Sequence, residues 1–340
     1  LFIYLLIIWI YLIFNSLYAI FFKIDHEYIY GGIIRSLGYI KFVIFSCSFL
    51  LFINKNLKFQ RIINVWFLIV SIILVDVFFE KIFGRNIIGN ISPDHTRIVS
   101  FFKDELVAGS FLFCFGFLTT LYLYNRNDTS VPKKNLYFIL LFIITLAILI
   151  TGERSNFIKS IIFFSILLII LPSNKLYINK KIIFVLILAS ITTLIFFDKN
   201  INQKYNEFFD RVNASSNKGI NKFENIKYFS HYNVAIEIFK DNVFFGVGNK
   251  NFRWECHMEK YFDASEKFSP QRCSTHPHQV HFELLSEHGL IGYLLIVYLL
   301  LKFIFPVFRD SNQDNIYIRK CLVYFLLVFL LPIIPSGSLF

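Results

Sequence analysis

The sequence contains few of the residues that mark soluble catalytic domains. Among 340 residues there are one methionine, eight prolines and five cysteines, and only 17% are charged. It has no Walker A loop, no nucleophile elbow and no arginine-rich sensor helix, so ATP-driven pumps, serine hydrolases and voltage sensors have no support. No CxxC pair with zinc-ribbon spacing is present, and there are no internal repeats. These absences exclude most common soluble enzyme and repeat classes.

What the sequence does contain is apolar. Hydrophobic residues make up 56% and aromatic residues 19%, with 44 phenylalanines and a mean hydropathy of +0.59. A transmembrane helix needs about 20 apolar residues. The sequence therefore predicts an all-α, polytopic transmembrane protein with nine or more spans. The candidates are 1–22, 36–53, 62–80, 105–124, 136–151, 157–173, 182–197, 289–308 and 320–340. Because the sequence opens on Leu1 and stops inside an apolar run at Phe340, we expect it to be a fragment with further spans.

The net charge of +11 is distributed as a topology signal. The connections 54–61, 125–135, 174–181 and 302–320 hold 13 Lys/Arg against 3 Asp/Glu, whereas the alternate connections hold 19 against 17. Excess basic charge on every second loop marks the cytoplasmic side. Segment 198–288 is then a large extracytoplasmic loop between helices of 1–197 and helices of 289–340. The basic charge is not clustered as nucleic-acid binding requires, so no nucleic-acid partner is expected.

Two cysteines share the predicted external loop. Cys256 and Cys273 would face an oxidising compartment if the membrane is a bacterial inner membrane, so either a disulfide or two free thiols fits the sequence. In the same loop, Ser230–Asn242 predicts a short amphipathic helix. Gly246 and Gly248 follow it and are expected to form turns.

Residues 275–292, with the sequence THPHQVHFELLSEHGLIG, crowd four histidines against a hydrophobic span. An ionisable cluster beside lipid is costly to keep and is a functional-site hypothesis. One imidazole suits a general base, because its pKa lies near neutral pH. A zinc site and inert interfacial histidines are the alternatives. A helix starting at Pro277 would place His278, His281 and Leu285 on one side.

This segment resembles the O-antigen ligase family. His278-Gln279, nine further residues and then Gly289-Leu-Ile-Gly292 are similar to that family's signature, and Glu287 precedes the first glycine by two residues. The resemblance implies that His278 is the essential histidine. It also implies that His276 and His281 are neighbours shaping the site.

The resemblance extends to other segments. The turn Thr151–Asn156 is similar to an arginine-bearing turn of the family, which implies that Arg154 holds a diphosphate; its planar guanidinium suits that ligand. Arg97 and Arg253 are further candidate anion ligands. Where family ligases usually carry an arginine before the external helix, this sequence has Ser230-His231, so His231 or Arg211 is expected to substitute.

Two acidic features of the external loop 81–104 and its flanks are also notable. Asp76 is interpreted either as a solvated helix end or as a sugar contact. Asp104 and Glu105 are interpreted as capping residues of the next helix, because acids favour a helix N-terminus.

The resemblance implies a metal-independent glycosyltransferase without a cofactor. It would move a glycan from an undecaprenyl-diphosphate carrier to an acceptor glycolipid or glycan, at the periplasmic face of the inner membrane. His278 and Arg154 would be catalytic, and Arg97, Arg253, His231, His276 and Glu287 would bind substrate. A polymerase of the Wzy type and, less favoured, a transporter of lipid-linked sugars are the alternatives.

Overall fold

In the computed structural model, all regular secondary structure in the described part of the chain is helical. That part comprises residues 2–22, 30–54, 58–94, 97–103, 105–124, 131–170, 227–263, 269–309, 316–332 and 334–337, with the single positions 189, 192, 202, 203 and 206. No strand occurs within these ranges. Arg211, Asp104 and most of the predicted span 182–197 lie outside the described residues.

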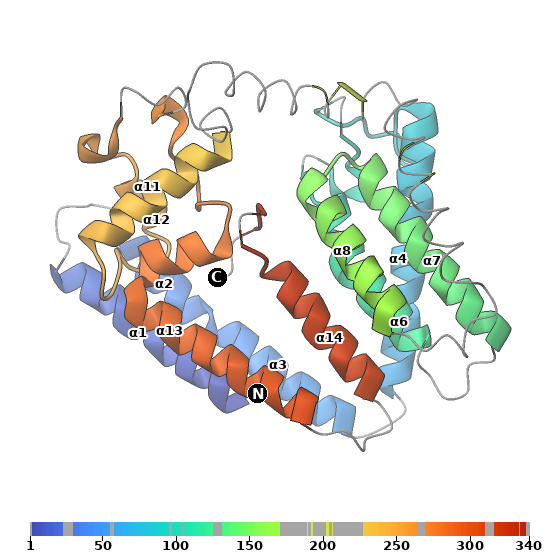
Figure 1. Cartoon of the computed structure of the whole chain (residues 1–340), viewed down its shortest axis with the longest axis horizontal. Coiled ribbons are helices and arrows are strands. Elements are labelled where there is room, and N and C mark those ends of the chain that lie inside the picture. Colours follow the sequence, from blue (N-terminus) through green and yellow to red (C-terminus); the bar gives the residue numbers. More distant parts are fainter. Residues whose placement is uncertain are drawn as a thin grey trace. The chain divides into compact units, whose positions relative to one another are not determined.

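The chain divides into two compact units (Figure 1). The first unit comprises Leu1–Lys55, Phe208–Pro306 and Leu330–Phe340, and the second comprises Asn56–Glu207 and Val307–Phe329. The helices of the first unit are α1 (Phe2–Phe22), α2 (Tyr30–Gly38), α3 (Ile40–Asn54), α11 (Lys227–Asp241), α12 (Phe252–Glu255) and most of α13 (Val280–Arg309), with short turns η4 (Glu259–Tyr261) and η5 (Ser269–Gln271). The helices of the second unit are α4 (Lys58–Phe83), η1 (Ser100–Phe102), α5 (Ala108–Phe111), η2 (Leu112–Gly116), α6 (Phe117–Tyr124), α7 (Val131–Ile150), α8 (Arg154–Ile170) and α14 (Ile316–Phe329).

Among the described residues, three helices are long and apolar enough to cross a membrane. They are Phe2–Phe22, Gln60–Phe83 and Val280–Arg309, and shorter apolar helices cover Ala108–Tyr124 and Asn135–Ile150. Helices also occupy most of the other predicted spans, which confirms the all-α prediction over the described residues. The total of nine spans, the large external loop and the division at 197 and 288 stay predictions.

The second unit has an aromatic core. Helix α7 packs on α4, α6 and α8, and α14 packs on α6 and α8. Phe113 stacks on Phe325 with ring centroids 4.9 Å apart, and Phe163 meets Phe325 edge-on at 5.2 Å. Side chains of Phe, Leu and Ile thus fill this bundle, as expected of helices whose apolar positions surround the whole circumference.

Two acidic residues behave differently from the sequence-based interpretation. Asp76 is fully buried, and its carboxylate accepts hydrogen bonds from the Ile87 N–H at 2.7 Å and the Ser100 hydroxyl at 2.6 Å. It is therefore not a solvated helix end, because it fixes the loop that follows α4. Glu105 does not cap a helix either, since α5 begins at Ala108 with Val107 at the N-cap position and no side-chain cap.

Candidate functional site

The position of His278 follows from how helix α13 begins. The helix starts at Val280, and the side-chain oxygen of Gln279 accepts hydrogen bonds from the N–H groups of His281 (2.6 Å) and Phe282 (3.1 Å). Gln279 is thus the N-cap, because an N-cap side chain accepts from the second and third helical N–H groups. His278 lies directly before it with φ 59°. The predicted helix start at Pro277 was wrong, because Gln279 caps a helix that begins three residues after that proline, at Val280.

The two glycines of the motif have separate uses. Gly289 has φ 64° and ψ −169°, which breaks α13 near its start. A Cβ on Gly289 would lie 2.4 Å from the Phe244 carbonyl carbon, so the break also permits a close backbone approach. Gly292 instead packs against Tyr11 of α1, so α13 and α1 approach closely at that glycine.

At the Gly289 break, backbone hydrogen bonds are exchanged between α13 and the loop after α11. The Val247 and Gly248 N–H groups donate to the carbonyls of Ser286 (3.0 Å) and Glu287 (2.8 Å). In return, the Leu290 and Ile291 N–H groups donate to the carbonyls of Val243 (2.7 Å) and Phe244 (3.2 Å). Ser286 and Glu287 are the residues that Leu290 and Ile291 would contact in an unbroken helix. The loop therefore pairs these four backbone groups, as a helix break in an apolar setting requires.

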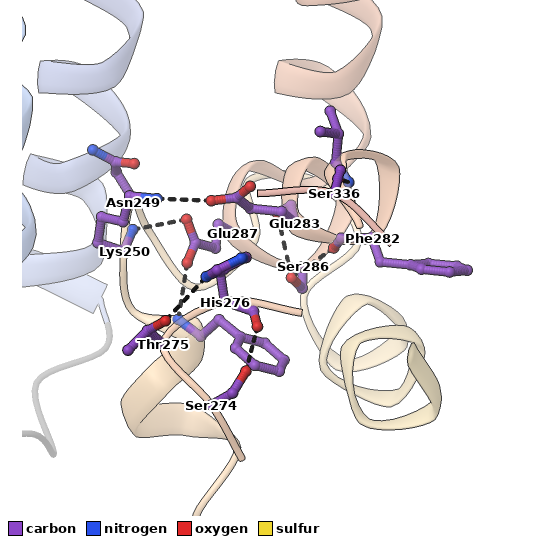
Figure 2. A network of polar contacts seen from close by, with 12 residues as sticks. Asn249, Lys250, Ser274, Thr275, His276, Phe282, Glu283, Ser286, Glu287 and Ser336 are labelled. Atoms are coloured by element: carbon purple, nitrogen blue, oxygen red, sulfur yellow. Dashed lines mark hydrogen bonds and ion pairs between the residues drawn. The ribbon is translucent and has the colours of Figure 1, made fainter. Parts of the chain in front are cut away.

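A buried ionic network attaches the same loop to α13 (Figure 2). The Lys250 ammonium lies 2.7 Å from the Glu283 carboxylate, with side-chain exposures of 6% and 0%. Glu287 accepts from the backbone N–H groups of Lys250 (2.8 Å) and Phe252 (3.3 Å). Glu283 and Glu287 are one helical turn apart, so both carboxylates face this loop.

Three imidazoles and one phenol surround the N-terminus of α13. The ring centroid of His278 lies 4.3 Å from that of His276, 5.4 Å from that of His231 and 5.3 Å from that of Tyr228. Helix α11 supplies Tyr228 and His231, whereas the strip leading into α13 supplies His276 and His278. The structure thus brings three of the predicted site histidines together.

The ring of His276 is partly buried and lies near charged side chains. Its Nδ1 is 3.0 Å from the Thr275 hydroxyl (Figure 2). Its Nε2 is buried, and no hydrogen bond of ordinary geometry reaches it from the described residues. Burial lowers the pKa of His276, Glu283 opposes this shift, and Lys250 and Arg253 add to it. Because the neutral imidazole is favoured, this histidine suits hydrogen bonding to a hydroxyl near neutral pH.

Arg253 brings a cation to the same place. Burial lowers its pKa, the neighbouring Arg35 lowers it further, and Glu287 and Glu283 oppose the shift. A guanidinium nevertheless stays protonated at neutral pH. Arg253 therefore lies within electrostatic reach of His276 and of the two carboxylates on α13, as a candidate anion ligand of the first unit.

The strip 256–273, which leads toward the histidines, is held by covalent and polar contacts. A disulfide joins Cys256 to Cys273, which confirms that option. Arg272 donates to the backbone carbonyls of Cys256, His257, Met258 and Ser269 at 2.9 to 3.3 Å. Its own carbonyl accepts from Nδ1 of the buried His231 at 2.8 Å. This strip orients the His231 ring, while Arg272 is occupied in structural contacts.

The remaining motif histidines have structural partners. His281 Nε2 donates to the Leu330 carbonyl at 2.8 Å, and its Nδ1 lies 3.2 Å from the Tyr293 hydroxyl. His288 Nδ1 donates to the Asn15 side-chain oxygen at 3.1 Å, and the His288 carbonyl accepts from the Tyr11 hydroxyl at 2.9 Å. Both histidines join α13 to neighbouring segments rather than pointing toward His278.

The predicted catalytic and binding arginines of the second unit flank one turn. Arg154 is the first residue of α8, and Arg97 lies before Ile98, whose N–H donates to the Thr151 carbonyl at 3.3 Å. Burial raises the pKa of Glu153 in this turn, while bonds from Asn156 and Gly109 and the charge of Arg97 oppose the rise. Arg97 and Arg154 are therefore positioned by the same turn. Their relation to His278, which belongs to the first unit, stays a prediction.

Several residues of the first-unit site were missed by sequence reasoning. Lys250 and Tyr228 carried no motif signal, because their partners Glu283 and His278 lie dozens of residues away. Gln279 was visible as part of the motif, and a polar residue directly before an apolar helical run is an N-cap signal. That signal could have identified the true start of α13.

The described structure defines a class: a helical membrane protein with a histidine cluster at the start of a candidate span. Residues 139–297 match the family model described as O-antigen ligase, a little under half of the chain. The match supports an assignment to the O-antigen ligase family, which is the family that the histidine motif resembles. It supports a membrane glycosyl-transfer function of the ligase or polymerase kind. No curated protein matches the chain significantly.

Proposed function

We propose that this protein transfers a glycan from an undecaprenyl-diphosphate carrier to an acceptor hydroxyl, at the periplasmic face of a bacterial inner membrane. The observation that carries the proposal is the position of His278. It precedes the Gln279 cap, and its ring lies beside those of His276 and His231. A base held by a capped helix and surrounded by imidazoles suits proton transfer from a bound hydroxyl.

In the proposed reaction the acceptor oxygen attacks the anomeric carbon of the donor sugar. His278 takes the hydroxyl proton, the new glycosidic bond forms, and the bond between the sugar and the diphosphate oxygen breaks. Arg253 neutralises the departing diphosphate. The family resemblance implies the same role for Arg154 and Arg97. Cleavage of the donor's sugar–diphosphate bond supplies the driving force, so the proposal includes no nucleotide, metal or cofactor.

The other predicted binding residues have different parts in this proposal. His276 and His231 contact the acceptor or donor sugar beside His278. The Glu287 carboxylate accepts from two backbone N–H groups of the 250–252 loop. We therefore propose that Glu287 acts by holding that loop, and with it Arg253, rather than by touching the sugar.

The test is His278→Gln in a strain that lacks the chromosomal gene, with His257→Ala as the matched control. His257 is exposed and lies in the strip 256–273. We expect His278→Gln to lose transfer of the surface glycan at unchanged protein level, because amide nitrogen and oxygen do not accept a proton near neutral pH. His257→Ala should retain transfer. Full transfer by His278→Gln would contradict the proposal.

A polymerase would use the same chemistry with a second carrier-linked glycan as acceptor, and the O-antigen ligase family match supports either acceptor. The pattern of surface polysaccharide in the deletion strain distinguishes them. Loss of all capped lipopolysaccharide indicates ligation, whereas caps of a single repeat unit indicate failed polymerisation. Normal surface glycan with the carrier-linked donor accumulating inside would favour transport instead.

A further inference from the structure

The loop after α4 ends in a turn whose chemistry is unusual for a water-exposed surface. Gly89 N–H donates to the Asn86 carbonyl at 2.9 Å, so Ile87 and Ile88 occupy the two central positions of a tight turn. Gly, Pro, Asn and Asp normally fill such positions. Here the two isoleucines are 52% and 70% exposed. We call Asn86–Gly89 the isoleucine turn.

The isoleucine turn is rigid. The buried side chain of Asn86 donates to the Ser100 carbonyl at 2.8 Å and accepts from the Asn90 N–H at 2.7 Å. The Asn86 N–H in turn donates to the Asn90 carbonyl at 2.9 Å. Exposure of the two isoleucines is therefore imposed by buried polar contacts on the other side of the turn.

The turn also folds back along α4. Ile87 N–H donates to the carboxylate of Asp76, which lies seven residues before the last residue of the helix, Phe83. At 1.5 Å per residue this is about 10 Å back along the helix axis. Over the same stretch α4 presents exposed Val75, Ile82 and Phe83. The isoleucine turn is thus continuous with the apolar surface of a candidate membrane span.

We propose that the isoleucine turn inserts into the lipid leaflet at which α4 ends, with the exposed Arg85 among the anionic headgroups. Apolar side chains at the interface gain from leaving water, and an arginine beside them gains from headgroup charge. Because Asp76 and Glu80 also bind Ser100, the turn is tied to the segment that carries Arg97. Insertion would then hold the Arg97 and Arg154 guanidinium groups at headgroup depth. The inference rests on α4 as a membrane span and not on glycan transfer.

The experiment places a fluorophore on the turn in the full chain. Ile88→Cys, and separately Ile87→Cys, are made in a background in which Cys47, Cys114 and Cys321 are replaced by alanine; the Cys256–Cys273 disulfide is kept. The labelled protein is reconstituted into nanodiscs of phosphatidylcholine and phosphatidylglycerol. Quenching by acyl-chain nitroxide lipids is compared with quenching by aqueous iodide. Lys240→Cys, at an exposed position of α11, is the matched control.

We expect labels at both turn positions to be quenched by the acyl-chain nitroxide and shielded from iodide, with Lys240→Cys showing the reverse. Quenching by iodide at Ile87 and Ile88 equal to that at Lys240 would overturn the proposal. Shielding from both quenchers would also overturn it, because protein rather than lipid would then cover the turn. Loss or retention of glycan transfer does not affect this measurement, so the two proposals fail separately.

Discussion

Replacing Gly289 by alanine tests the backbone exchange that shapes the site. The added Cβ would lie 2.4 Å from the carbonyl carbon and oxygen of Phe244 and 2.6 Å from the Gly246 nitrogen. All three are backbone atoms, so no flexible side chain can relieve the overlap. The residue also keeps φ 64° and ψ −169°, a conformation that is essentially restricted to glycine.

The expected cost is the sum of two effects. Backbone strain in this region costs about 1–3 kcal/mol. The added Cβ would also push α13 away from the loop after α11, and the two are joined by four reciprocal hydrogen bonds. Each bond contributes about 1 kcal/mol net, and we expect two or three of them to be lost. The total of about 3–6 kcal/mol is a large part of a typical folding free energy of about 5–15 kcal/mol. At about 2 °C per kcal/mol, the apparent Tm should fall by about 6–12 °C.

The assay is thermal unfolding of the full chain in detergent, followed by glycan transfer in cells. Gly38→Ala is the matched control, since Gly38 ends α2 with open space around it and no positive φ. Its Tm should stay level or rise slightly, because alanine favours a helix over glycine. If Gly289→Ala has the same Tm as Gly38→Ala and transfers glycan normally, the reasoning about the exchanged backbone hydrogen bonds is refuted.

Three further predictions concern the same unit. Lys250→Met should destabilise the protein by about 3–5 kcal/mol, since it leaves Glu283 buried without its cation. Adding Glu283→Leu should recover part of the lost Tm. If Tm does not recover, the ion pair is not what stabilises this contact. Gln279→Ala should lower the free energy of unfolding, measured by chemical denaturation, by about 1 kcal/mol. It should also lower kcat more than it changes KM, because His278 loses its capped neighbour. An equal loss of stability in Gln279→Asn would contradict a capping role. Because burial holds the pKa of His276 below 6.5 in the folded protein, the unfolded chain binds more protons as pH falls through that value, so stability should decline below pH 6.5. His276→Gln should flatten this decline, and an unchanged Tm-against-pH slope would count against the assignment.

The helices were predictable because long apolar runs are a strong signal, and α1, α4 and α13 lie where such runs occur. Their ends were less predictable. Pro277 suggested a helix start, but the Gln279 side chain caps the helix later, as its bond to the His281 N–H shows. Asp76 was misread for a related reason, because its partners Ile87 and Ser100 come from a loop that folds back on the helix.

The candidate site was predictable where one short segment carries it. His276 and His278 were found from the motif, and His231 was found by looking for a substitute for an expected arginine. Lys250 was not found, since an isolated lysine in a loop gives no hint of a carboxylate 33 residues further along the chain. Pairing of distant residues follows from tertiary packing, which hydrophobic periodicity does not encode.

The polar contacts of α1 have a consequence for how the protein is made. Asn15 and Tyr11 bind backbone or side-chain groups of Phe245 and His288, residues that leave the ribosome 230 to 277 positions later. Until α13 is synthesised and docks, the Asn15 amide must find water or a temporary partner, because bare contact with lipid is unfavourable. The first unit can therefore assemble only after α13 has been synthesised, long after α1. A chain released before α13 is made would expose the polar side chains of α1, and such defective copies could be recognised by them and degraded.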